Sequence, residues 1–288
     1  MWNSVNEQIS QAMHFDFKHT FKRQLKSPNN DRYFQIGDDL HHFFVKVAHL
    51  SDLERFECEA LNLKLLTQES LFMIPDCITT GCNIEFSFMV LEWLELDKQP
   101  HNNTNWHEMG EYLANLHQKH TQAMFGFDND NFLGSTLQPN RWHKKWDVFF
   151  AEERIGWQLQ LLQEKGIELV DQDTFIAFVK DALHSHVVEP SLLHGDFWRR
   201  NMGFYNNVPS VFDPACYYGD RECDIATSEL YAPLPDSFYD TYNDIYPLQV
   251  GYEHRRAIYQ LYPMLNNANI FAGHYLTEAK QHIQQLLK

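Results

Sequence analysis

The sequence predicts an α+β fold of two lobes: a small N-terminal lobe with an antiparallel sheet and a helix, and a larger, mainly helical C-terminal lobe. Strand-like and helical segments alternate over the first third of the 288 residues, and helical periodicity dominates afterwards. A polar stretch, 97–105, separates the two parts. The predicted lobes are therefore residues 1–97 and 98–288, which suits a chain of this length.

A strand is predicted at 41–47 in the first lobe. Side chains alternate between the two faces of a strand, so Phe43, Val45 and Val47 share one face. Lys46 projects from the other face.

The next segment, 52–66, is predicted to be an amphipathic helix. Its apolar residues recur at helical spacing and form one stripe: Leu53, Phe56, Ala60, Leu63 and Leu66. Glu59 falls inside this stripe, whereas Glu57 lies at its edge. An unpaired carboxylate in an apolar interior is costly, so Glu59 needs a cationic partner.

A continuous apolar run at 86–91 predicts a buried strand that ends at Glu92 and Trp93. Beyond the polar stretch, helical spacing begins at Trp106. Further helices are expected at 142–164, 173–187 and 252–287. An insertion of another character, 191–224, holds strand-like pieces at 202–205 and 210–212 and the densest polar chemistry of the chain.

Composition narrows the function classes. The net charge of −16 disfavours nucleic-acid binding, which depends on Lys and Arg. The five cysteines form no CxxC pair, and the sixteen histidines include no HExxH motif, so neither a disulfide framework nor a zinc site is expected. The N-terminus lacks the features of a secretory signal, and no run of residues is suited to span a bilayer. We expect a cytoplasmic protein without a nucleic-acid or membrane partner.

The densest motif is His194-Gly195-Asp196, followed five residues later by Asn201 and then by Asp213. Phosphoryl transfer to an alcohol needs a carboxylate that orients or accepts the hydroxyl proton, which suits Asp196. It also needs hard oxygen ligands for Mg²⁺, which suits the amide of Asn201 and the carboxylate of Asp213. The alternative interpretation is a polar loop that ties helices together.

Lys46 and Glu59 complete this set. Kinases use a strand lysine to hold the phosphates of ATP and a helix glutamate to position that lysine. Taken alone, Lys46 has the ordinary interpretation of an exposed strand lysine.

With these motifs the chain resembles the fructosamine-3-kinase family, which includes bacterial members and belongs to the wider aminoglycoside phosphotransferase and choline kinase group. The resemblance covers about residues 40–265. The motifs HGD-x-W at 194–198, FDPA-x-x-Y-G at 212–219 and N-x-W-x-x-x-W at 140–146 carry it. The resemblance implies a protein-kinase-like fold.

The resemblance also implies roles for single residues. Asp196 would be the catalytic base, Asn201 and Asp213 would bind Mg²⁺, and Lys46 with Glu59 would hold ATP.

Other residues would complete the ATP and substrate sites. Glu92, Trp93 and Leu94 would form the segment that binds adenine. Trp198 would pack on the sugar, although it could instead anchor the loop. Asp220 would either contact substrate or serve the structure. Asp224 is expected to be structural, capping a helix that begins near Ile225 and bracing the catalytic loop.

The implied activity is ATP-dependent phosphorylation of a ketosamine, a sugar joined to an amine by glycation, at its 3-hydroxyl. The role would be deglycation, with the chain acting as a monomer or weak homodimer. A kinase of another small alcohol is the nearest alternative. A nucleotide-binding pseudokinase is another, because the segment 20–35, where a glycine-rich phosphate loop is expected, contains no Gly. The cations of this segment could meet phosphates or belong to a solvated hairpin.

Overall fold

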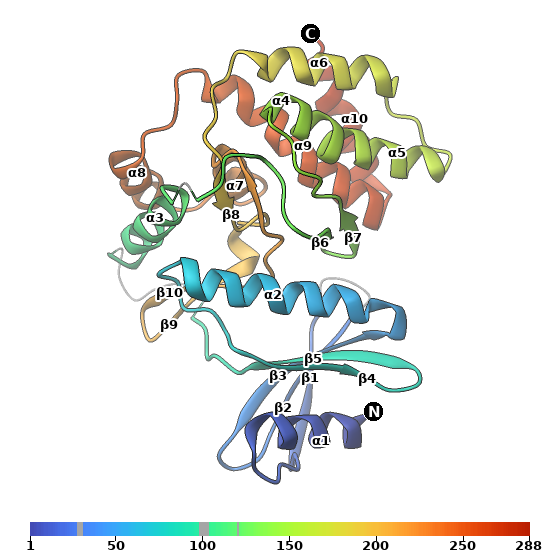
Figure 1. Ribbon diagram of the computed structural model, residues 1–288, viewed down its shortest axis with the longest axis vertical. Coiled ribbons are helices and arrows are strands. Elements are labelled where there is room, and N and C mark those ends of the chain that lie inside the picture. Colours follow the sequence, from blue (N-terminus) through green and yellow to red (C-terminus); the bar gives the residue numbers. More distant parts are fainter. Residues whose placement is uncertain (28–30, 98–103, 120) are drawn as a thin grey trace.

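The computed structural model describes residues 1–27, 31–97, 104–119 and 121–288. The first part of the chain forms a five-stranded antiparallel sheet in the order β1-β2-β3-β5-β4 (Figure 1). Its strands are β1 (Phe21–Leu25), β2 (Arg32–Gly37), β3 (His42–His49), β4 (Cys77–Cys82) and β5 (Phe86–Glu92). The strands predicted at 41–47 and 86–91 are thus β3 and β5.

One helix covers each face of this sheet (Figure 1). Helix α1 (Trp2–Met13) packs Val5 and Ile9 against Val45 and Val47 of β3 in one apolar cluster. Helix α2 (Leu53–Glu69) packs on the opposite face, toward which Lys46 points to meet Glu59. The predicted alternation of β3 is confirmed.

The second part of the chain is mainly helical, as expected. Its helices are α3 (Thr104–His117), α4 (Trp146–Phe149), the π-helical turn Phe150–Gly156, α5 (Trp157–Glu164), α6 (Gln172–His184), α7 (Glu222–Glu229), α8 (Asp236–Ile245), α9 (Tyr252–Phe271) and α10 (His274–Leu286). Among the described residues, no helix is long and apolar enough to cross a membrane.

The single helix predicted at 252–287 is wrong, because α9 and α10 are separate helices. Ala272 and Gly273 between them adopt positive φ angles of 52° and 57°, which a right-handed helix does not accommodate. The chain reverses there, and α10 packs back along α9.

Three short two-stranded sheets complete the second part. They are β6 (Asn131–Leu133) with β7 (Thr136–Gln138), β8 (Ser191–Leu193) with β11 (Tyr217–Gly219), and β9 (Met202–Tyr205) with β10 (Val208–Val211). The pieces predicted at 202–205 and 210–212 correspond to β9 and β10.

The β9–β10 hairpin links the two parts of the chain. Asp97 and Phe204 exchange backbone hydrogen bonds of 2.9 Å in each direction, and Met73 forms a bridge with Ser210. The predicted boundary between residues 97 and 98 lies beside residues 98–103, which are outside the described residues. The chain between Asn201 and Asp213 is therefore held against both parts.

Helices α3 and α8 pack closely at Gly110, which leads to a prediction about stability. A Cβ atom added to Gly110 of α3 would lie 2.4 Å from the backbone oxygen of Phe238 in α8. Gly110→Ala should lower the free energy of unfolding by about 1–3 kcal/mol in chemical denaturation, because neither helix backbone can move freely. The sign of the change in the free energy of unfolding distinguishes the two cases, because Gly→Ala within an unconstrained helix stabilises a protein by about 0.5–1 kcal/mol.

Glu111→Ala, on the exposed side of the same helix, is the matched control and should change stability little. A Gly110→Ala protein at least as stable as the control would contradict the close packing of α3 and α8.

Candidate active site

The HGD motif follows β8 and is shaped by two close contacts. Gly195 has φ +81°, and a Cβ atom there would lie 2.0 Å from the backbone oxygen of Ala215. The N–H of Ala215 donates to the oxygen of His194 at 2.9 Å. Only glycine fits this position without displacing the chain that carries Asp213.

Asp224 braces this loop from α7. Its carboxylate accepts the backbone N–H groups of His194 at 2.8 Å and Gly195 at 2.9 Å. It also lies 3.2 Å from the ring of His117, whose pKa is lowered by burial. The expected bracing is present, but the expected capping is wrong, because α7 begins at Glu222 and Asp224 lies within its first turn.

Asp196 and Asn201 meet across the loop that joins them. Nδ2 of Asn201 donates to Oδ2 of Asp196 at 2.6 Å and to its backbone oxygen at 3.1 Å. The Asn201 amide oxygen takes no part in these two bonds, so it remains suited to a metal ion. Burial raises the pKa of Asp196 to about 7; the Asn201 hydrogen bond opposes this rise, and the Asp213 carboxylate adds to it.

Lys46 joins two carboxylates from different parts of the chain. Its Nζ donates to Oε1 of Glu59 at 2.6 Å and to Oδ1 of Asp213. The Lys46 side chain is only 4% exposed. The cationic partner predicted for Glu59 is therefore Lys46.

The charges of this group depend on one another. Burial alone would lower the pKa of Lys46, but the carboxylates of Asp213 and Glu59 reverse this and raise it. Burial would raise the pKa of Asp213, yet Lys46 holds it below its ordinary value. Burial raises the pKa of Glu59 to about 7 despite the opposing charge of Lys46. The lysine is thus a fixed positive charge beside Asp213.

A cavity of about 990 Å³ opens beside these groups. Six of the predicted site residues line it: Lys46, Glu59, Asp196, Trp198, Asn201 and Asp213. Arg200 also lines the cavity, and its guanidinium carbon lies 5.2 Å from the centre of the Trp198 ring. The structure therefore brings the predicted catalytic and metal-binding residues to one concave site.

The predicted adenine-binding residues are not among the residues that line this cavity. Glu92 ends β5, and the N–H of Trp93 donates to the backbone oxygen of His42 at 3.3 Å. Leu94 is buried beyond them. The cavity extends from Lys46 toward the C-terminal helices instead.

The structure does not support the predicted substrate contact of Asp220. Its side chain is buried and does not line the cavity. The carboxylate accepts the hydroxyl of Tyr259 at 2.5 Å and the backbone N–H of Glu222 at 3.0 Å, and it meets the ring of His186 at 2.8 Å. With its oxygens used in this way, Asp220 ties β11 and α7 to α9.

The glycine-free segment 20–35 is a hairpin of β1 and β2 over its described residues. Arg23 donates to Gln35 at 2.7 Å on the neighbouring strand. Asp31, just before β2, is held by Arg55 of α2 through two hydrogen bonds of 2.8 and 2.9 Å. Residues 28–30 lie outside the described part. Sequence reasoning missed the ion pair of Asp31 with Arg55, because nothing in the spacing of these two residues indicates it.

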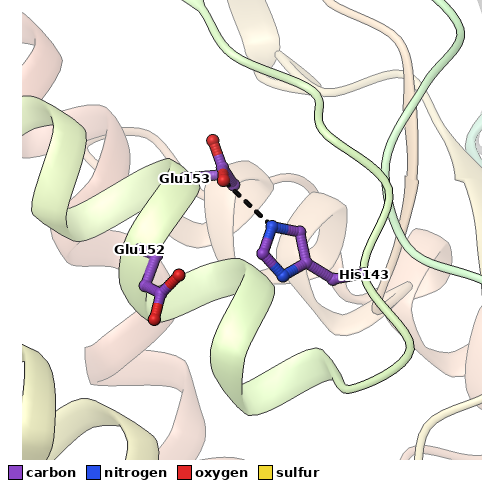
Figure 2. A group of neighbouring side chains, drawn as sticks. All are labelled: His143, Glu152 and Glu153. Carbon is purple, nitrogen blue, oxygen red and sulfur yellow. Dashed lines mark hydrogen bonds and ion pairs between the residues drawn. The ribbon is translucent and has the colours of Figure 1, made fainter.

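Two groups of His and acidic side chains resemble metal sites, but cationic side chains already occupy them. In the first, His143 lies 2.9 Å from Glu153, and Glu152 lies beside them (Figure 2). Arg141 pairs with Glu153 at 2.8 Å, and Lys180 pairs with Glu152 at 2.5 Å.

The second group, His186, Asp220 and Glu222, includes the ion pair of Arg255 with Glu222 at 2.7 Å. Both groups are best described as ion-pair networks.

Sequence reasoning also missed one wall of the cavity. It is made by the loop after α7 and by α9 and α10, and it includes Tyr231, Asn267, Phe271, His274, Tyr275 and Glu278. These residues form no motif. The reversal between α9 and α10 brings them together.

The fold and motifs agree with the chain's relatives. The sequence model of the fructosamine kinase family matches residues 1–288. A probable ketoamine kinase of Vibrio parahaemolyticus is 45% identical over 287 residues, which cover 100% of this chain and 99% of the relative.

Solved structures agree as well. A crystal structure from Haemophilus somnus 129PT, named for fructosamine-3-kinase, is 36% identical, with a TM-score of 0.95 over 100% of this chain and 98% of that one. Choline kinase LicA from Streptococcus pneumoniae has a TM-score of 0.67 at 16% identity, covering 99% of this chain and 98% of that one, and shares the fold. The chain therefore belongs to the fructosamine kinase family, and it is an ATP-dependent phosphotransferase with a bilobal, protein-kinase-like fold.

Proposed function

We propose that this protein transfers the γ-phosphoryl group of ATP to a sugar hydroxyl of a ketosamine, at its 3-position. The observation that carries the proposal is the convergence of Lys46, Asp196, Asn201 and Asp213 on one cavity. The relatives named for ketoamine kinases support the choice of acceptor. The cellular role would be deglycation, in which the phosphorylated adduct breaks down and releases the amine.

In this proposal Asp196 accepts or orients the proton of the attacking hydroxyl. A general base works best when its pKa lies near the operating pH, and burial places that of Asp196 at about 7. The hydrogen bond from Asn201 fixes the carboxylate, so one oxygen is held while the group faces the cavity. The hydroxyl and the phosphate would then meet in a defined orientation.

Asn201 and Asp213 would hold magnesium. An amide oxygen and a carboxylate are hard ligands of the kind this ion prefers, and both residues line the cavity. When bound, magnesium would neutralise charge on the phosphates. Lys46 balances the charge of Asp213, which supports the proposal that this carboxylate is ionised and able to bind a cation.

The other roles follow from position. Lys46, fixed by Glu59, would hold the α- and β-phosphates of ATP. Glu92, Trp93 and Leu94, at the end of β5, would bind adenine. Trp198 would present its ring to the C–H side of the sugar. Residues 1–97 would then form the ATP-binding lobe, and residues 98–288 the catalytic and substrate-binding lobe.

The first test replaces the proposed base. Asp196→Asn should lower kcat for ketosamine phosphorylation by about 10²–10⁴-fold, because it removes the proton acceptor. ATP affinity, measured by calorimetry, and the circular dichroism spectrum should stay close to those of the wild type. Fructoselysine, ribulose-lysine, glycated protein and a set of aminoglycosides serve as acceptors.

Asp181→Asn, at an exposed site on α6, is the matched control. An Asp196→Asn protein within about tenfold of wild-type kcat would remove the proposed role of Asp196. If the wild-type protein phosphorylated only aminoglycosides, the kinase activity would stand, but the proposed ketosamine acceptor would be wrong.

The second test addresses the proposed binding of the ATP phosphates by Lys46. Lys46→Met keeps most of the side-chain volume but removes the charge, so kcat/KM for ATP should fall by about 10²-fold or more. Lys64→Met, on the exposed side of α2, should leave that ratio unchanged. Unaltered KM and kcat for ATP in a folded Lys46→Met protein would exclude Lys46 from the nucleotide site.

A further inference from the structure

The cavity extends well beyond the reacting groups. Its volume of about 990 Å³ lies at the upper end of the range of about 300–1,000 Å³ that holds small ligands. Neither Glu92, Trp93 nor Leu94 lines it, whereas residues of the two C-terminal helices do. The additional space is therefore available to the acceptor.

The wall of this cavity made by Tyr231, Asn267, Phe271, His274, Tyr275 and Glu278 is built by the loop after α7 and the reversal between α9 and α10. The backbone turns at residues 272–273, where both φ angles are positive. Helix α10 then returns along α9, and its first turns join the wall. Side chains from three separate segments thus meet around one space.

The chemistry of this wall is aromatic and acidic. The Tyr231 hydroxyl donates to Oε2 of Glu278 at 3.5 Å, and Nδ2 of Asn267 donates to the Tyr231 hydroxyl at 3.4 Å. The rings of Phe271 and Tyr275 lie 5.5 Å apart. Aromatic faces beside a carboxylate favour a cation, because ring quadrupole and formal charge attract it together.

Glu278 differs from the other carboxylates that line the described cavity. Glu59 and Asp213 are bound to Lys46, and Asp196 accepts from Asn201. Glu278 accepts from the neutral hydroxyl of Tyr231 and is only partly buried. His274, which also lines the cavity, is exposed, and its ring centre lies 3.9 Å from that of Tyr275. Within the described lining, Glu278 is thus the carboxylate best placed to meet a cationic ligand.

We infer that Glu278, with Tyr231 and Tyr275, forms a subsite for the protonated amine end of the acceptor. The inference rests on the proposed function and deepens it, because a ketosamine carries an ammonium group next to its sugar. The amine nitrogen of a ketosamine is bonded to C1, two carbons from the reacting C3, so Asp196 and Glu278 would contact one sugar from two sides of the cavity that both line. This subsite would separate ketosamines from amine-free sugars.

The test compares two acceptors in wild-type and variant proteins. One is the fructosamine of methylamine, which carries the ammonium group, and the other is 1-O-methyl-fructose, which has an ether oxygen in its place. In Glu278→Gln, the preference for the amine, measured as the ratio of the two kcat/KM values, should fall by about fivefold through KM. Tyr275→Leu should shift the ratio in the same direction, by about threefold.

Glu253→Gln, a carboxylate on α9 outside the cavity lining that is paired with Arg256 at 2.7 Å, is the matched control and should keep the wild-type ratio. A wild-type protein active on the fructosamine, with the same ratio in both Glu278→Gln and Tyr275→Leu, overturns the subsite and leaves the proposed function standing. A wild-type protein inactive on both acceptors overturns the proposed function and the subsite with it.

Discussion

One buried ammonium group joins the two parts of this protein at its active site. Lys46 comes from the central strand β3, Glu59 from the helix that covers that strand, and Asp213 from the chain that follows the β9–β10 hairpin. The Lys46 side chain is only 4% exposed and that of Glu59 11%, whereas the Asp213 side chain is 32% exposed. Without the two carboxylates the buried ammonium group would be left uncompensated, which is strongly destabilising. The sheet, α2 and the catalytic segment are therefore positioned by a shared electrostatic requirement.

The charge of Lys46 also determines the protonation of the neighbouring carboxylates. Asp213 is kept ionised by Lys46, while burial and the charge of Asp213 raise the pKa of Asp196. Two carboxylates near each other thus acquire different properties, one suited to a metal ion and one to a proton. Asn201 serves both carboxylates. Its amide nitrogen donates to Asp196, and its amide oxygen, which takes no part in that bond, is suited to a cation beside Asp213. The HGD loop supports this division, with Asp224 holding its backbone in place.

Much of this arrangement could be predicted from the sequence, wherever burial imposes a pattern. Alternation placed Lys46 on the strand face opposite Phe43, Val45 and Val47, and helical spacing placed Glu59 in the apolar stripe of its helix. The pairing of Lys46 with Glu59 followed from the kinase pattern. The roles of long-range contacts could not be predicted. The sequence left Asp220 open between a substrate contact and a structural role, because the motif does not reveal that Tyr259, 39 residues away, donates to its carboxylate. The break at Ala272 was missed because a positive φ angle at alanine has no signal in composition.

The central claim is that phosphate from ATP is transferred to a ketosamine. The most direct measurement is phosphorus and carbon NMR of the product formed from ATP, magnesium and a fructosamine labelled with carbon-13 at C3. The expected product is a phosphate monoester whose phosphorus couples to C3, formed in step with ADP. ADP formation without any phosphorylated fructosamine, or no ADP although ATP is bound, would contradict it.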